Sequence, residues 1–191
     1  MRKDGIPAEN AQGRPHNQRR FLRLLALLLA AFALFSAVWH FTAYRPYDAY
    51  VSALRAQPGW REDPAFPGCG TDGEGYTCNV ARPGFLHWTG NLGIGLPALT
   101  LESGEEIGYT DSLLIWPRLF RAPEAGVILY EYDFQADGVT CTGHQMYITP
   151  EGKYIPYGDG AEDAANEALL TERRGNVETL LSRAREIWNI P

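Results

Sequence analysis

Three cysteines and two histidines are the residues of this sequence best suited to nucleophilic or metal chemistry: Cys69, Cys78, Cys141, His87 and His144. A thiol beside an imidazole acts as a nucleophile, because the imidazole accepts the thiol proton. In a regular strand, however, alternation places Cys141 and His144 on opposite faces unless Gly143 forms a bulge. A small exported enzyme, a hydrolase or thiol enzyme using Cys141 with His144 or His87, is therefore the alternative function.

Cys69 and Cys78 enclose a glycine-rich loop, CGTDGEGYTC. In an oxidising compartment, a disulfide closing a ring of this size stabilises the fold by about 2–3 kcal/mol. Three cysteines allow three pairings, and the sequence favours Cys69–Cys78, with Cys141 as a buried thiol. The loop also contains Asp72 and Glu74, but it lacks the alternating acids of a calcium-binding loop.

Established catalytic and cofactor motifs do not occur in this chain. It has no Gly-x-Ser-x-Gly, no HExxH and no phosphate-binding or dinucleotide fingerprint. The cysteine and histidine spacing also lacks the close pairs of a zinc site. We therefore predict no metal, no cofactor and no assigned catalytic residue.

Apolar alternation predicts the strands that carry the cysteine and histidine candidates. In Val127–Phe134, Ile128, Tyr130 and Tyr132 share one side, and Val139–Ile148 forms an antiparallel partner strand. Further strands are expected at Phe85–Thr89, Leu92–Leu101, Ser112–Trp116 and Lys153–Tyr157. Together these segments predict a small antiparallel meander of four to six strands.

Helical periodicity predicts helices before and after the sheet. After Pro46, Tyr47, Val51 and Leu54 fall on one helical face. Near the end of the chain, Ala161, Ala165, Ala168 and Leu169 share a face of a first C-terminal helix. A second helix has the strongest stripe, formed by Val177, Leu180, Leu181, Ala184, Ile187 and Trp188. We expect a C-terminal helix or helix pair to cover the sheet, giving an α+β fold.

The N-terminal region differs from the rest of the chain. Residues 21–43 are almost entirely apolar and long enough to cross a bilayer. Arg19, Arg20 and Arg23 precede or begin this stretch, so the positive-inside rule places the N-terminus in the cytoplasm. A cleaved signal peptide is the alternative, but Phe35 and Phe41 occupy positions where a cleavage site requires small residues.

The chain thus divides into four predicted regions. Residues 1–20 are a disordered basic cytoplasmic tail, 21–43 a transmembrane signal-anchor helix, 44–75 a juxtamembrane helix and Pro/Gly-rich loop, and 76–191 an extracytoplasmic α+β domain. From Tyr44 on, 11 Lys/Arg face 21 Asp/Glu. An acidic domain of this kind is repelled by phosphate backbones, which argues against nucleic-acid binding.

These observations favour a single-pass cell-membrane protein with its bulk outside the cytoplasm. The expected function is non-enzymatic, that of a binding or accessory protein of a cell envelope. The expected partners are the lipid bilayer and an envelope protein. An exposed aromatic patch involving Trp60, Trp88 or Trp116 would favour the partner-binding interpretation.

Overall fold

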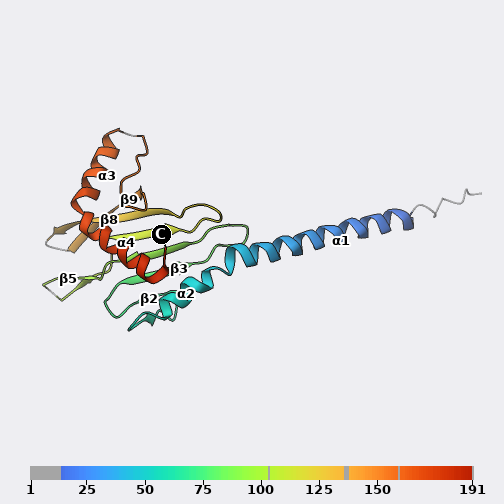
Figure 1. Cartoon of the computed structure of the whole chain (residues 1–191), viewed down its shortest axis with the longest axis horizontal. Helices are drawn as coiled ribbons and strands as arrows, with labels where there is room; N and C mark the ends of the chain where they lie inside the picture. The colour runs from blue at the N-terminus through green and yellow to red at the C-terminus, as the bar shows by residue number, and fades with distance from the viewer. Residues whose placement is uncertain (1–13, 103, 136–137, 159, 191) are drawn as a thin grey trace, which may run out of the picture. The chain divides into compact units, whose positions relative to one another are not determined.

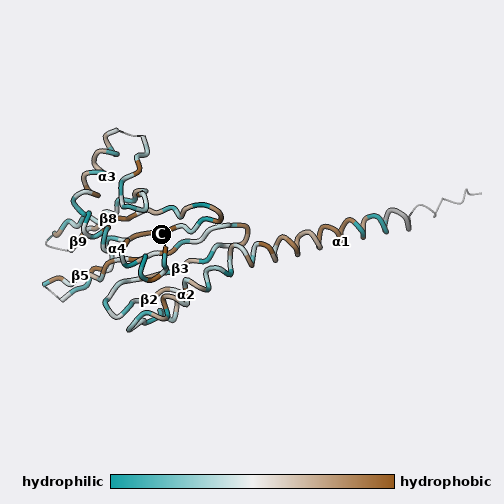
Figure 2. Tube along the Cα trace, in the orientation of Figure 1, coloured by the Kyte–Doolittle hydropathy of each residue, from teal (hydrophilic) through white to brown (hydrophobic). Residues whose placement is uncertain are grey.

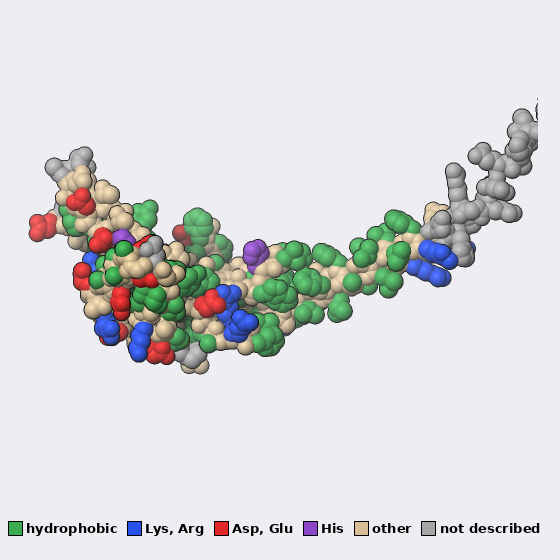
Figure 3. Space-filling view, turned by 90° about the horizontal axis from the view of Figure 1, so that it is seen from above, with side chains coloured by type: hydrophobic (Ala, Val, Ile, Leu, Met, Phe, Trp, Pro, Cys, Tyr) green, Lys and Arg blue, Asp and Glu red, His purple; other side chains and the backbone are tan. Residues whose placement is uncertain are grey.

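The computed structural model describes residues 14–102, 104–135, 138–158 and 160–190. The chain forms two compact units, Met1–His40 and Phe41–Pro191. The first unit contains helix α1 (Arg14–Trp39), which is hydrophobic over most of its length (Figure 2). Basic side chains lie near its start and hydrophobic ones along the remainder (Figure 3).

Helix α1 begins at Arg14, seven residues before the predicted transmembrane stretch, so it extends into the predicted tail. Residues 1–13 of that tail lie outside the described residues. Among the described residues, one helical run, Gln18–Arg55, has the length and apolar composition of a membrane span. A signal sequence has the same properties, so this helix supports a membrane span or signal anchor by length and composition only.

The second unit starts with a short π-helix, η1 (His40–Tyr44), followed by α2 (Tyr47–Arg55). Tyr47, Val51 and Leu54 of α2 are buried, which confirms the helical face predicted from their spacing. The Pro/Gly-rich loop expected in the predicted region 44–75 includes two short strands, β1 (Arg61–Glu62) and β2 (Cys69–Thr71).

A seven-stranded antiparallel sheet forms the centre of this unit (Figure 1). After β1 and β2 its strands are β3 (Thr77–Ala81), β4 (Asn91–Gly95), β7 (Ser112–Trp116), β8 (Glu124–Gln135) and β9 (Gly138–Ile148). Neighbours in the sheet follow chain order, interrupted by a separate hairpin of β5 (Leu99–Thr100) and β6 (Glu106–Ile107). The predicted antiparallel meander is confirmed, with more strands than expected.

Strand boundaries differ from the sequence predictions in three places. Residues 85–89, expected to form a strand, belong to the loop between β3 and β4. The apolar run Leu92–Leu101 divides into β4 and β5 around Pro97, since proline cannot donate to a sheet ladder. The expected strand Lys153–Tyr157 contributes a single bridge, between Tyr154 and Ile148.

One face of the sheet carries the hydrophobic core, and we call it the covered face. Its buried side chains are Cys78, Val80, Leu92, Ile94, Leu113, Ile115, Val127, Leu129, Met146 and Ile148. Helix α2 packs on β3, and α4 (Arg174–Trp188) packs on β4 and β7. The six residues of the predicted α4 stripe are all buried. The α+β fold is thus confirmed, with C-terminal helices against a mostly antiparallel sheet.

The first C-terminal helix, α3 (Gly160–Glu172), buries only part of the face predicted for it, since Leu169 is half-buried and packs against the core. Ala161, Ala165 and Ala168 are exposed, whereas Asn166 and Leu170 are buried. The alanine spacing indicated a helix correctly but not its orientation, because small side chains are tolerated equally well in solvent and in contact.

Candidate functional site: the open face of the sheet

We call the opposite side of the sheet the open face; none of the described strand residues on it is a buried hydrophobic side chain. Strand register assigns side chains from all seven strands to this face. Two of them are charged, Arg61 of β1, opposite Thr71, and Glu124 of β8, opposite Trp116. The others are Cys69, Thr71, Thr77, Asn79, Ala81, Asn91, Gly93, Gly95, Ser112, Leu114, Trp116, Gly126, Ile128, Tyr130, Tyr132, Phe134, Val139, Cys141, Gly143, Gln145 and Tyr147. Apart from Arg61 and Glu124, none of these side chains is charged, although 21% of the chain is Asp, Glu, Lys or Arg. A large surface with so few charges is uncommon on an acidic domain and is typical of a contact surface.

Aromatic rings on the open face pack closely against glycines. A Cβ atom on Gly126 would come 3.2 Å from the Trp116 ring, and one on Gly143 would come 3.1 Å from Tyr130. Trp116 also contacts Tyr147, with 5.7 Å between ring centroids. These two glycines therefore leave room for the Trp116 and Tyr130 rings to pack against the backbone.

A hollow of about 320 Å³ indents this face over β3, β4, β7 and β8. Its lining combines polar and apolar side chains, among them Thr77, Asn79, Ser112, Leu114 and Ile128. The hollow lies where Gly93 and Gly95 contribute no side chain to the surface. Such a mixture of hydroxyl, amide and aliphatic groups suits an uncharged contacting segment rather than an ion.

The open face ends at β9, an edge strand of the sheet. Residues 153–155 cover its last residues, since the Ile155 N–H donates to the Tyr147 carbonyl over 3.0 Å. From Gly138 to His144, no other strand of the described residues pairs with the outer side of β9. This stretch lacks Lys, Arg, Asp, Glu and Pro, with which natural edge strands discourage further pairing.

The predicted Cys69–Cys78 disulfide is not formed, and all three cysteines are free thiols. In the register of β2 with β3, Cys69 is opposite Asn79 and Cys78 is opposite Gly70. Because neighbouring pairs point to opposite faces, Cys69 lies on the open side and Cys78 in the core. Burial raises the pKa of the Cys78 thiol to about 12, with the nearby Asp72 carboxylate adding to the rise. Cys78 is therefore an uncharged core group.

Cys141 and His144 are not brought together. The ladder between β8 and β9 is continuous, with Cys141 opposite Tyr132 and His144 opposite Leu129. No bulge occurs at Gly143, so the two side chains point to opposite faces. His144 instead pairs with Glu131, with 2.7 Å between Nε2 and Oε2. Cys141 is half-buried on the open face rather than in the core.

His87 is also remote from Cys141. It lies in the loop that follows β3, at the end of the sheet where β8 begins. Cys141 lies opposite Tyr132, eight residues farther along β8 than Glu124. Eight strand residues span about 26 Å, too far for an imidazole to accept the thiol proton.

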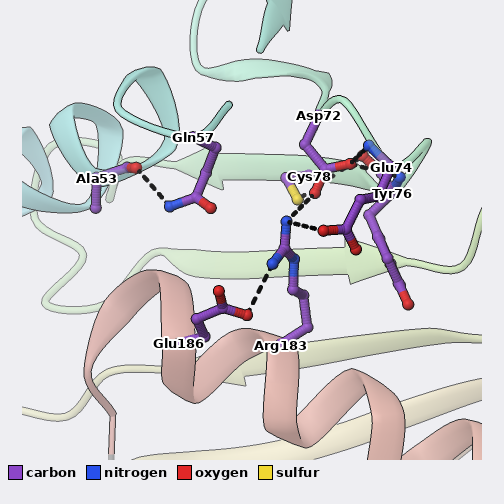
Figure 4. Close-up of polar contacts among 8 residues, drawn as sticks. All are labelled: Ala53, Gln57, Asp72, Glu74, Tyr76, Cys78, Arg183 and Glu186. Atoms are coloured by element: carbon purple, nitrogen blue, oxygen red, sulfur yellow. Dashed lines mark hydrogen bonds and ion pairs between the residues drawn. The ribbon is translucent and has the colours of Figure 1, made fainter. Parts of the chain in front are cut away.

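Asp72 and Glu74, considered as cation ligands, instead form ion pairs with Arg183 of α4 (Figure 4). Asp72 is fully buried and accepts hydrogen bonds from the Glu74 and Tyr76 backbone N–H groups and from Arg183 over 2.8 Å. Burial opposes the charge of Arg183, but hydrogen bonds to Asp72 and Glu186 outweigh burial and raise its pKa. The cluster attaches the loop after β2 to α4, which is a structural role.

The tryptophans considered as a partner-binding patch have three different environments. Trp116 lies on the open face, and Trp88 is 42% exposed in the loop after β3. Trp60 packs against the backbone of Gly70, where a Cβ atom would come 2.7 Å from its ring. Sequence reasoning predicted the alternation of β8 but not that its aromatic side would remain uncovered. The sequence feature that could have indicated this is the lack of charged residues on that side of β8 from Gly126 to Phe134.

Comparison of the chain with family models, with curated proteins and with solved structures finds no match.

Proposed function

We propose that this chain is a membrane-anchored, extracytoplasmic binding protein of a cell envelope, and that its open face binds a second protein. The observation that carries the proposal is the aromatic open face, on which strand register places two charged residues, Arg61 and Glu124, although the unit as a whole is acidic. Centres of protein–protein interfaces are depleted in charge and enriched in Tyr and Trp. The unblocked edge of β9 supports the same proposal, because a partner strand could extend the sheet there.

The proposed anchor is the apolar stretch 21–43. Arginine side chains precede it, and its far end leads directly into the globular unit. With the positive-inside rule, this order leaves the N-terminus in the cytoplasm and exports the open face. A surface with few charges is then presented to other proteins of the envelope rather than to cytoplasmic nucleic acid.

Of the two functions that the sequence left open, binding has the stronger geometric support. A thiol enzyme needs an imidazole next to Cys141, but His144 points to the other face and His87 lies at the other end of β8. Binding needs an accessible, complementary surface, and Ile128, Tyr130 and Tyr132 supply one.

Site-specific photocrosslinking of the full chain in its native cells tests this proposal. A benzophenone amino acid is placed at Ile128, Tyr132 or Gln145 on the open face, and at the exposed residues Phe66 and Arg174 as matched controls. We expect one discrete crosslinked product, shared by the open-face positions and missing from the controls. The product should disappear when Leu114→Lys is combined with the probe at Tyr132, because a partner cannot bury an unpaired charge.

Two outcomes contradict the proposal. One is equal crosslinking at open-face and control positions, which would show that contacts are not specific to this face. The other is a lack of crosslinking at all three open-face positions in protein that carbonate extraction shows to be membrane-bound. Release by carbonate would instead contradict the anchor.

A further inference from the structure

Two loops at one end of the sheet form a separate surface, which we call the rim: residues 82–90 between β3 and β4, and residues 117–123 between β7 and β8. β3 and β7 run in the same direction, since each is antiparallel to β4. Their following loops therefore leave the sheet at the same end (Figure 1). A hollow of about 370 Å³ lies between the loops and is lined by residues from both, including Trp88 and Phe120.

The globular unit also begins at this end. The Arg82 guanidinium lies 5.3 Å from the centre of the Tyr44 ring and forms a 2.6 Å ion pair with Asp48. The Gly90 N–H donates to the Tyr47 hydroxyl over 2.7 Å. These three contacts hold the first residues after the apolar stretch 21–43 against the rim.

Large apolar side chains project into solvent from the rim. Their exposed fractions are 94% for Phe120, 58% for Leu86, 48% for Phe85, 42% for Trp88 and 40% for Leu119. Leu86 and Phe120 also have positive φ angles, 69° and 65°. Bulky residues rarely adopt this conformation, and such strain is concentrated at functional surfaces. Five exposed hydrophobic groups in two adjoining loops indicate a surface that contacts an apolar phase.

The charge of the rim is opposite to that of the remaining unit. Together with residues 44–48 and Glu124, the rim contains Arg45, Arg82, Arg118 and Arg121 against Asp48 and Glu124. The other residues from Tyr44 on contain seven Lys/Arg and nineteen Asp/Glu. Arginine beside aromatic and aliphatic groups matches a membrane interface, where phosphates lie next to the hydrocarbon boundary.

We propose that the rim docks on the anionic phospholipid surface of the bilayer that carries the anchor. Phe85, Leu86, Trp88, Leu119 and Phe120 enter the interface, and Arg45 and Arg121 bind lipid phosphates. Arg82 and Arg118 are ion-paired with Asp48 and Glu124 and hold the rim together. The inference rests on the proposed anchoring. From Ala43 to Tyr47 the chain is four residues long and spans at most about 14 Å, so the rim is tethered near the headgroups. Docking would direct the strands away from the membrane and leave the open face accessible to a partner.

Hydrogen exchange of the full chain in lipid nanodiscs tests the docking. Nanodiscs of phosphatidylcholine with about 30% phosphatidylglycerol are compared with phosphatidylcholine alone and with detergent. We expect amides in 84–88 and 119–121 to exchange about tenfold more slowly in the anionic nanodiscs than in detergent. The β5–β6 hairpin serves as the internal control and should exchange equally in all three.

Variants separate the apolar and electrostatic contributions to docking of the rim on the bilayer. Leu86→Ser with Phe120→Ser should abolish protection in both lipid mixtures, whereas Phe66→Ser with Ile155→Ser, also exposed, should preserve it. Arg121→Gln should reduce the extra protection given by phosphatidylglycerol, and Arg61→Gln should not. Equal exchange of the rim in nanodiscs and detergent would overturn the inference. Protection found in native membranes but not in pure lipid would also overturn it, by assigning the rim to a protein partner.

A flotation experiment distinguishes an error in the proposed anchor from an error in the proposed docking of the rim. If the full chain does not float with vesicles after an alkaline carbonate wash, the anchor proposed above is wrong. If the chain floats and the rim exchanges as in detergent, the anchor stands and the rim proposal alone is wrong.

Discussion

The two faces of the central sheet are built from the same strands but have different chemistry. The covered face is aliphatic, with Val127 and Leu129 buried beneath the helices. The open face carries Ile128, Tyr130 and Tyr132 on that same strand, and these side chains remain partly accessible. Both faces are free of charge at their centres, although only one is enclosed. The comparison indicates that charge depletion on the open face has a cause other than burial within this chain, and binding is the cause we propose.

The largest expected effect on stability is on the covered side of the sheet, where Arg183 joins α4 to the loop after β2. Arg183→Met leaves Asp72 buried without its cation, and we expect the free energy of unfolding to fall by about 3–5 kcal/mol. Arg174→Met, an exposed change on the same helix, should alter it by less than about 0.5 kcal/mol. Urea unfolding of detergent-solubilised full chain, followed by tryptophan fluorescence, measures both. Similar losses in the two variants would show that the ion pair does not hold α4.

Leu113 and Leu114 give a matched comparison, because they are identical adjacent residues on opposite faces. Leu113 is fully buried and Leu114 is half-buried. Leu113→Ala should cost about 2–5 kcal/mol, since it opens a cavity in the core. Leu114→Ala should cost about 1 kcal/mol or less, since solvent can occupy the vacated volume. The same unfolding measurement applies, and equal costs would mean that the open face is covered in solution.

Alkaline pH should destabilise the covered face through Cys78. The pKa of this thiol is about 12 in the folded protein, against about 8.5 for an unfolded cysteine. Between these values the unfolded thiol is ionised and the folded one is neutral, so the unfolding free energy falls as pH rises. The expected slope is up to about 1.4 kcal/mol per pH unit.

Unfolding titrations of wild type and Cys78→Ala at pH values from neutral to alkaline isolate this effect, because all other groups titrate in both. Cys78→Ala should lack the additional slope, and Cys141→Ala should retain it. Parallel curves for wild type and Cys78→Ala would contradict the buried, neutral state of this thiol.

The smallest stability effect is expected on the open face, where the effect on binding should be largest. Tyr132→Lys should lower the unfolding free energy by about 1 kcal/mol or less, because its side chain is partly accessible and loses one hydrogen bond, from its hydroxyl to the Tyr109 carbonyl. It should nevertheless abolish the crosslink from Ile128. A loss of several kcal/mol with Tyr132→Lys would show that this residue is structural and would remove the main distinction between the faces.

The sequence determined the local elements of this protein. The apolar stretch of α1, the α4 stripe and the alternation of β8 and β9 all follow from periodicity, because each depends on residues close in the chain. The opposite orientations of Cys141 and His144 followed in the same way.

Tertiary structure alone decided which side of each element became buried. Alternation in β8 is equally compatible with a core of Val127 and Leu129 or of Ile128 and Tyr130, and packing of α2 and α4 selected the first. The burial of Asp72 by Arg183, 111 residues away, and the meeting of the two rim loops are likewise contacts between distant segments. Sequence patterns show whether a segment is a helix or a strand and which side chains share a face. The proposed function depends instead on which of those faces stays uncovered once the segments have packed.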